Sequence, residues 1–298
     1  MRTITNKLGL SSVWVDAVIQ DFLDYDKCGD ISVTGAINPP QVQVLTERHE
    51  DDLVEDVTDR LNVFLGNAVH AQLERVSDET ALSEERVVYD FNGVKVSLKP
   101  DRVEPIADTN PTEFCVKDFK VVSIWKVIHN ELDEYEQQGN IYAYIFRKIG
   151  INATKIVFEL LLKDWKHADS LRDKSYPQVH VKVIPFRVWS DEECEKFLDQ
   201  RIKIHMAARL LPDEALPKCT GEERWLRDER FCVMKKGAKK SSRNKPTKAE
   251  AQEWMDERGY SEPLYSIVYK SGENVRCERF CPAQPFCHQY ATEINPEF

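Results

Sequence analysis

The chain has 298 residues, of which 42% are hydrophobic, so it can form one large domain or a core domain with a smaller companion. It contains no apolar run of about 18 residues, which excludes a membrane-spanning helix of ordinary length. The net charge of -10 disfavours nonspecific coating of nucleic acid, because phosphate binding needs local positive potential.

The N-terminal residues lack the apolar core and the small-residue cleavage site of a secretion signal. We therefore expect a cytoplasmic protein. In that compartment the eight cysteines should be free thiols, metal ligands or cluster ligands rather than disulfides.

In chain order, the first predicted elements are a helical segment near 11–25, a Pro-Pro turn at 39–40 and a strongly helical stretch at 51–76. Four apolar residues in that stretch form a stripe at helical spacing, which supports the helix: Val57, Leu61, Leu65 and Ala68. Residues 86–91 and 94–98 predict a β-hairpin, because Asn-Gly between two alternating segments is a strong turn signal.

The next predicted elements are a strand at 114–122, FCVKDFKVV, a helix at 133–148 and strands at 155–165 and 178–186. Ser190 is followed three residues later by Glu193, a capping box that predicts a helix over 190–211. The composition changes near residue 212, and five of the eight cysteines follow it. We therefore expect three parts: an N-terminal segment packed on the core, the core, and a Cys-rich module with a basic insertion, at 1–45, 46–212 and 213–298.

Polar side chains on four predicted elements are candidates for one site. They are His70 on the helical stretch at 51–76, Asp101 after the hairpin, Asp118 and Lys120 on one face of the next strand, and Gln138 and Tyr142 on one face of the next helix. Taken singly, they have ordinary interpretations: an exposed histidine, a turn, an edge-strand ion pair and a polar patch. Taken together, two carboxylates and an imidazole suit Mg²⁺ or Mn²⁺, and a neighbouring lysine can serve a water nucleophile in phosphodiester hydrolysis.

The order of these motifs resembles that of the PD-(D/E)xK nuclease superfamily, and within it the RecB-type and CRISPR-associated exonucleases. The motifs are GxxxH at 66–70, PD at 100–101, DxK at 118–120 and QxxxY at 138–142. The third motif has Asp where many members have Glu. The resemblance implies an α/β, restriction-endonuclease-like core, with a mixed central sheet flanked by helices, followed by the Cys-rich module.

The same resemblance implies a Mg²⁺- or Mn²⁺-dependent DNA exonuclease. It implies Lys120 as the catalytic lysine, Gln138 and Tyr142 as residues that position DNA or the lysine, and four metal ligands: His70, Asp101, Asp118 and the backbone carbonyl of Phe119. Similar stand-alone proteins occur in bacteria and phages, where DNA recombination and end processing are plausible roles. The chain has no ATP-binding motif, so a helicase or recombinase partner would be a separate chain. The alternative is a catalytically silent nuclease fold that binds DNA ends or a partner protein.

Three cysteines near the C-terminus have the spacing C-x3-C-x5-C, at Cys277, Cys281 and Cys287. Such a group in a cytoplasmic chain suggests a metal or a cluster. Cys219 is the favoured fourth ligand, and its competitors are Cys28, Cys232 and His288. Cys115 and Cys194, on a predicted strand and helix, are expected to be core thiols.

The resemblance implies a structural [4Fe-4S] cluster, and zinc is the alternative. The family usually has C-x2-C for the first pair and a distant cysteine before the core, so this chain departs from the family at both points.

The stretch 235–248 contains seven Lys or Arg residues and no acidic residue. It is either a solvated loop or a contact to the DNA backbone through Lys235, Lys236, Lys239, Lys240 and Arg243. Three aromatic residues flank it and either fill the core of the module or stack on bases: Trp225, Trp254 and Tyr260.

Overall fold

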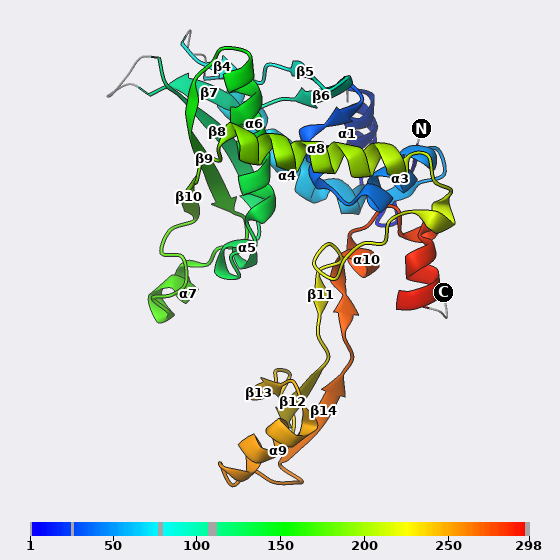
Figure 1. Ribbon diagram of the computed structural model, residues 1–298. Coiled ribbons are helices and arrows are strands. Elements are labelled where there is room, and N and C mark those ends of the chain that lie inside the picture. The colour runs from blue at the N-terminus through cyan, green and yellow to red at the C-terminus, as the bar shows by residue number, and fades with distance from the viewer. Residues whose placement is uncertain (1, 25–26, 77–79, 107–111, 296–298) are drawn as a thin grey trace. The chain divides into compact units, whose positions relative to one another are not determined.

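The computed structural model describes residues 2–24, 27–76, 80–106 and 112–295 of the chain, which divides into two compact units (Figure 1). The first unit is Met1–Asn38 with Glu50–Leu210, and the second is Pro39–His49 with Leu211–Phe298. The division after residue 210 lies next to the boundary expected near 212. The segment expected at 1–45 is instead shared between the units, because helix α3 (Pro40–Arg48) belongs with the C-terminal part of the chain.

A five-stranded mixed sheet with strand order β10-β9-β8-β7-β4 forms the centre of the first unit. Its strands are β4 (Leu82–Ser83), β7 (Arg102–Pro105), β8 (Phe114–Val122), β9 (Ala153–Leu162) and β10 (Val181–Phe186). β8 and β9 are parallel, and the other neighbours are antiparallel. The long apolar run of β9 is buried on both faces, as is usual for a central strand.

Two smaller sheets complete the strands of the first unit. One is β2-β6-β5, with strands β2 (Ile31–Ser32), β5 (Val87–Phe91) and β6 (Val94–Leu98), and the other pairs β1 (Thr3–Thr5) with β3 (Val54–Asp56). The predicted hairpin is β5-β6. Asn92 and Gly93 have φ angles of 53° and 85°, as a two-residue type I′ turn requires.

The main core lies between the five-stranded sheet and the longer helices. The remaining helical elements of this unit are α1 (Ser12–Leu23), α2 (Val33–Ile37), η1 (Val57–Arg60), α4 (Leu61–Glu74), α5 (Ile124–Ile128), α6 (Asp133–Lys148), α7 (His167–Arg172) and α8 (Asp191–Ala208). α6 packs on β8 and β9, so Ile141, Ile145 and Phe158 are fully buried. The capping box predicted at Ser190 is present and begins α8. The expected core thiols Cys115 and Cys194 are buried.

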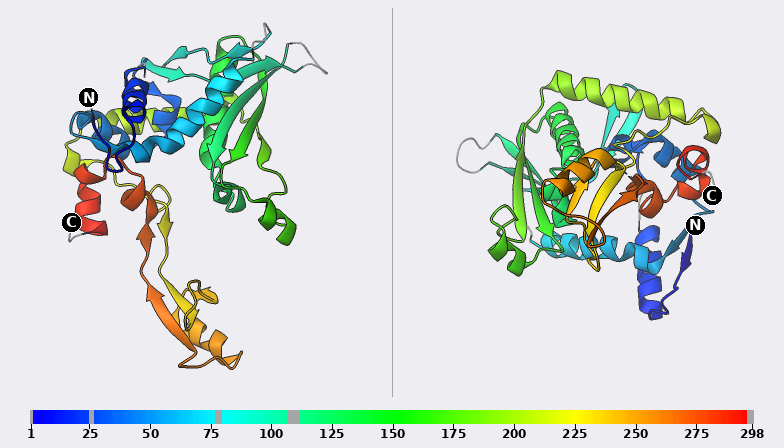
Figure 2. Two further views of the ribbon diagram at one scale, coloured as in Figure 1. Left: turned by 180° about the vertical axis from the view of Figure 1, so that it is seen from behind. Right: turned by 90° about the horizontal axis from the view of Figure 1, so that it is seen from below.

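The helix predicted at 51–76 forms as η1 and α4, but its first part is wrong because residues 54–56 form strand β3. The apolar stripe at 57–68 is buried only at its first position. Val57 is buried in η1, whereas Leu61 and Leu65 on α4 are 39% and 44% exposed, and α4 has no buried residue. α4 packs against β8 at the sheet and leaves much of its own surface exposed (Figure 2, left). The helical spacing of the apolar residues therefore predicted the helix, but these residues are not buried against another element.

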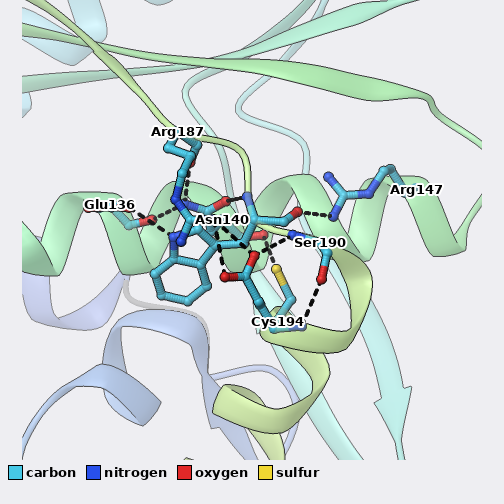
Figure 3. A network of polar contacts seen from close by, with 8 residues as sticks. Glu136, Asn140, Arg147, Arg187, Ser190 and Cys194 are labelled. Carbon is cyan, nitrogen blue, oxygen red and sulfur yellow. Dashed lines mark hydrogen bonds and ion pairs between the residues drawn. The ribbon is translucent and has the colours of Figure 1, made fainter.

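A polar network fixes α6 against the connection that leads into α8 (Figure 3). Asn140 donates to the carbonyl of Arg187 at 3.0 Å and accepts from the Trp189 backbone N–H at 2.7 Å. The Cys194 thiol lies 3.6 Å from the carbonyl of Asn140. Asn140 is fully buried, so these bonds satisfy its amide where water cannot. They hold α6 in place while its other side faces β8.

In its described residues, the second unit contains two short sheets and no long helix. Its elements are α3, η2 (Asp213–Ala215), β11 (Leu226–Arg227), β12 (Arg230–Lys235), β13 (Arg243–Lys245), α9 (Lys248–Asp256), β14 (Tyr265–Lys270), β15 (Glu273–Asn274), α10 (Val275–Arg279), η3 (Gln284–Phe286) and the π-helical turn η4 (Tyr290–Ile294). β11 pairs with β15, and β13-β12-β14 form a three-stranded sheet that packs on α9. Val233, Ala251 and Met255 form its small core, with Trp254 and Tyr260 against it.

Candidate functional site

The strand β8 brings a carboxylate and an ammonium together on one face, as the sequence predicts. Lys120 Nζ forms an ion pair with Asp118 Oδ1. The side chain of Asp118 is 1% exposed and that of Lys120 is 25% exposed, so the carboxyl is buried and the ammonium reaches the surface. The Lys120 ammonium is the neighbour of Asp118 Oδ1 that compensates its charge.

Helix α6 contributes Gln138 and Tyr142 to the same face of β8. Gln138 Nε2 donates to Asp118 Oδ2 at 3.1 Å and to Tyr142 OH at 2.9 Å. The two residues are four apart on the helix and therefore point in the same direction. Both are buried, so the predicted pair forms one connected polar group with Asp118.

A second polar group lies where α4 approaches the sheet. His70 Nδ1 is 3.3 Å from Asp101 Oδ1 and 3.7 Å from Glu84 Oε1. Among the residues that the structure describes, these three form the one set of His, Cys, Asp or Glu ligand atoms that all lie within 4.8 Å of one another. An imidazole and two carboxylates are suitable ligands for a divalent cation.

The two groups meet across β8. Asp101 Oδ2 accepts a hydrogen bond of 2.5 Å from the backbone N–H of Phe119, the residue after Asp118. Successive residues of a strand point to opposite faces. Asp118 and Lys120 therefore face α6, while Phe119 faces a cavity of about 260 Å³ that His70, Glu84 and Asp101 also line.

Glu84 is a site residue that sequence reasoning did not identify. It lies just after β4 with φ 55°, and its carboxylate also pairs with Lys99 Nζ at 2.5 Å. A positive φ is unusual for a residue with a long side chain and indicates a constrained position. No motif marked this position; Glu84 is one of two adjacent acidic residues, Glu84 and Glu85, between the helix at 51–76 and the hairpin.

The charges of the site shift three pKa values. Burial raises the pKa of Asp118 to about 6 against the opposing effect of Lys120, and the negative charge of Asp101 adds to the rise. The hydrogen bond with Asp101, and then that with Glu84, raise the pKa of His70 to about 10. The hydrogen bond with His70 lowers the pKa of Glu84. At neutral pH the metal-free site therefore holds a protonated histidine between two carboxylates.

Four cysteines of the second unit line one small pocket: Cys219, Cys277, Cys281 and Cys287. The competitors Cys28, Cys232 and His288 do not line it. Burial raises the pKa of Cys219 to about 12 and that of Cys277 to about 11. These thiols are therefore protonated at neutral pH unless a metal replaces the proton.

Polar contacts position the sulfur atoms of this pocket. The Cys219 thiol is 3.4 Å from Gln41 Oε1, and the Tyr290 backbone N–H is 3.3 Å from Cys287 Sγ. The side chain of Gln289 bonds to both the N–H and the carbonyl of Cys219. The sulfurs do not form a set within 4.8 Å, unlike the His70 group.

The basic stretch is not a simple loop, because it contains strand β13 and the end of β12. The five cationic residues proposed as DNA contacts are exposed: Lys235, Lys236, Lys239, Lys240 and Arg243. Of the flanking aromatics, Trp254 and Tyr260 pack in the small core, whereas Trp225 is 46% exposed.

None of the helices in the described residues combines the length and apolar character that crossing a membrane requires. No protein-family model matches the chain, and neither does any curated protein. Among solved structures, the crystal structure of SSO0001 is similar, with 16% sequence identity and a TM-score of 0.45; the match covers 65% of this chain and 85% of that one. At this level the likeness carries no conclusion about function.

Proposed function

We propose that the protein is a metal-dependent DNA nuclease of the PD-(D/E)xK type, with the first unit as a restriction-endonuclease-like core. The observation that carries this proposal is that six polar residues from α4, β8, α6 and the turn before β7 form two adjoining groups, which the hydrogen bond from the Phe119 N–H of β8 to Asp101 joins. They are His70, Asp101, Asp118, Lys120, Gln138 and Tyr142. Their order along the chain matches the four motifs.

The residues of the His70 group fit a hard divalent ion such as Mg²⁺ or Mn²⁺. Asp101 and Glu84 supply carboxylate oxygens, and His70 supplies a nitrogen once it loses its proton. The Asp118 carboxyl, which is ion-paired with Lys120 and lies outside this set, and the Phe119 carbonyl are the further ligands that the family pattern implies. An ion held there would polarise the scissile phosphodiester and activate water.

The remaining residues have roles that follow from their contacts. The Lys120 ammonium reaches the surface beside Asp118, where it can orient the attacking water and offset negative charge in the transition state. Gln138 fixes the carboxyl of Asp118 and the hydroxyl of Tyr142 in one orientation. We infer that this bridge keeps the side chains of Asp118 and Lys120 in the orientation that hydrolysis needs.

The four-cysteine pocket is proposed to hold a [4Fe-4S] cluster that stabilises the second unit. Thiolates around one zinc ion, at about 2.3 Å each, lie roughly 3.8 Å apart in a tetrahedron. The sulfurs here are spread more widely than a 4.8 Å set, which favours a larger group over a single zinc ion. Because Cys219 and Cys277 flank the β11–β15 insertion, such a cluster would join the two ends of that insertion.

The exposed cations from Lys235 to Arg243 are proposed to contact the DNA backbone. They gather positive charge in a chain whose net charge is -10, so DNA would be attracted to this part of the surface specifically. A helicase or recombinase from a separate chain would supply unwound or recombining DNA ends.

The test is degradation of end-labelled single- and double-stranded DNA with Mg²⁺ or Mn²⁺, comparing the wild type with Asp118→Ala. We expect metal-dependent products from the wild type and none from the variant, and the ladder will separate exonuclease from endonuclease action. A folded, cofactor-loaded wild type that binds DNA and does not cut would instead favour the catalytically silent alternative.

A further inference from the structure

An unusual tryptophan closes the turn between the first cysteine of the pocket and strand β11. The Trp225 N–H bonds to the carbonyl of Glu222 at 2.9 Å, and the Leu226 N–H bonds to that of Gly221 at 2.8 Å. This pair of bonds is the Schellman arrangement, in which the penultimate residue has a positive φ and is usually glycine. Trp225 occupies that position with φ 52°. A bulky residue is strained there, so local folding does not explain the choice of tryptophan.

Next to this strained backbone, two aromatic rings are exposed to solvent. Trp225 is 46% exposed and Phe280 is 61% exposed, and their ring centroids are 5.5 Å apart at an interplanar angle of 55°. The Arg276 guanidinium lies 5.7 Å from the centre of the Trp225 ring. Exposed rings beside a guanidinium group are the elements from which proteins build stacking sites for bases.

The surroundings of these rings are rich in arginine. Four guanidinium groups belong to the two segments that carry the rings: Arg224, Arg227, Arg276 and Arg279. Glu273 lies 3.7 Å from both Arg227 and Arg279, so one carboxylate is shared between two cations. Two further carboxylates of this region, those of Glu223 and Glu278, accept backbone N–H groups.

Two hydrogen-bond acceptors of the Arg224 side chain are neutral oxygens. Its guanidinium donates to Asn274 Oδ1 at 2.5 Å and to the carbonyl of Thr220 at 3.2 Å. No carboxylate neutralises it through these bonds, so it keeps the capacity to attract an anionic strand. Glu222, Asp228 and Glu229 belong to the same segments, so the surface is not positive throughout. It places apolar ring faces beside individual guanidinium groups, an arrangement that suits a base joined to a phosphate.

We propose that Trp225 and Phe280 form a platform on which an unpaired nucleobase of a DNA strand stacks, with the neighbouring arginines beside its phosphates. The identity of the ligand rests on the proposed nuclease function. The platform assigns the second unit a task in holding single-stranded DNA, separate from cutting.

The test measures equilibrium binding by fluorescence anisotropy, without divalent metal so that the strand stays intact. The ligands are a short oligothymidylate and an abasic oligonucleotide of equal length, which has the same phosphates and no bases. For Trp225→Ala we expect about tenfold weaker binding of the oligothymidylate and unchanged binding of the abasic strand. Trp225→Phe should keep most of the affinity, and Phe280→Ala should lose part of it. The matched control is Trp125→Ala, because Trp125 is 57% exposed in the first unit.

Three results would overturn the platform. Unchanged oligothymidylate binding by both alanine variants at Trp225 and Phe280 would exclude stacking and leave a protein-docking surface as the alternative. Equal losses on both oligonucleotides would show an electrostatic or structural effect in place of base recognition. Absence of DNA binding by the folded wild type would also exclude it. Metal-dependent cutting by the same wild-type preparation keeps the nuclease proposal intact in the first two cases, and absence of both cutting and binding contradicts both proposals.

Discussion

The side-chain amide of Gln138 connects Asp118 and Tyr142 in the candidate site: its Nε2 lies 3.1 Å from Asp118 Oδ2 and 2.9 Å from Tyr142 OH. Beyond that amide, the buried carboxyl of Asp118 has the Lys120 ammonium as its compensating neighbour. A buried carboxylate usually has several hydrogen-bond donors, so this one is held at a cost in stability. Such a cost is expected at a site selected for activity.

We predict that Asp118→Asn stabilises the metal-free protein at pH 8. Burial raises the pKa of Asp118 from 3.8 to about 6, so the folded state binds more protons than the unfolded state between these values. Wild-type stability should therefore fall as the pH rises from about 4 to 6, by at most about 3 kcal/mol. Thermal melting of both proteins between pH 4 and 8 measures the effect, and the gain should shrink toward pH 4. A variant that is less stable at every pH would contradict this account of the carboxyl.

Binding of Mn²⁺ should release protons and strengthen with pH. The hydrogen bond with Asp101 raises the pKa of His70 to about 10, so at pH 7 an ion must displace the proton of the imidazole. Without metal, the raised pKa has a second effect: the stabilisation is complete below about pH 6.5 and is lost as the pH rises through about 10.

Titration calorimetry in two buffers with different ionisation enthalpies counts the protons. We expect about one proton released per ion at pH 7 for the wild type. His70→Asn should bind more weakly and release fewer protons. Equal proton release by the two proteins would exclude His70 as a ligand.

Two helical glycines should respond to alanine in opposite ways. A Cβ at Gly139 would lie 2.5 Å from Ile156 Cγ2 and 3.0 Å from Phe158 Cε2, because α6 approaches β9 closely there. Gly139→Ala should destabilise the protein by about 1–3 kcal/mol. A Cβ at Gly66 meets nothing within 4 Å, so Gly66→Ala should stabilise α4 by up to about 1 kcal/mol. Urea denaturation compares them, and equal effects would show that the α6–β9 contact is looser than described.

Nuclease assays of Gly66→Ala test whether the glycine of the GxxxH motif is needed for DNA to approach His70. Loss of cutting by a protein that has become more stable would indicate that substrate approaches α4 at Gly66.

The cysteine pocket predicts which thiol is the fourth ligand. Cys219→Ser should lose most of the bound iron and sulfide and should melt at a lower temperature, because cofactor binding contributes to folding. Cys28→Ser is the matched control, since Cys28 does not line the pocket and should keep its full cofactor content. Elemental analysis and visible absorbance of anaerobically purified proteins measure this. Loss of cofactor in Cys28→Ser with retention in Cys219→Ser would reverse the assignment.

Local signals predicted the elements that carry most of the site. The strand at 114–122 and the helix at 133–148 have the predicted bounds, and the hairpin forms around Asn92 and Gly93. In each case the signal is local: β-branched residues, helical spacing or a turn dipeptide. Because side-chain direction follows from the element, the pairings of Asp118 with Lys120 and of Gln138 with Tyr142 could also be predicted.

Features that depend on distant packing could not be predicted. The periodicity of Leu61 and Leu65 indicates a helix, but not whether another layer covers it, and none covers these residues in the described part of the chain. Glu84 joins His70 and Asp101 only because β4 pairs with β7 and brings the end of β4 to Asp101. A two-residue strand such as β4 leaves too short a pattern to recognise.

The most direct test of the central claim is the single-turnover rate of DNA hydrolysis with Mn²⁺ for the wild type and Lys120→Ala. Lys120 acts in the transition state in this account, so the variant should cut about 10²–10³-fold more slowly while its affinity for DNA and Mn²⁺ stays the same. Equal cutting rates for the two proteins would contradict the assignment of this site, and no metal-dependent cutting by a folded wild type that binds both ligands would contradict the nuclease itself.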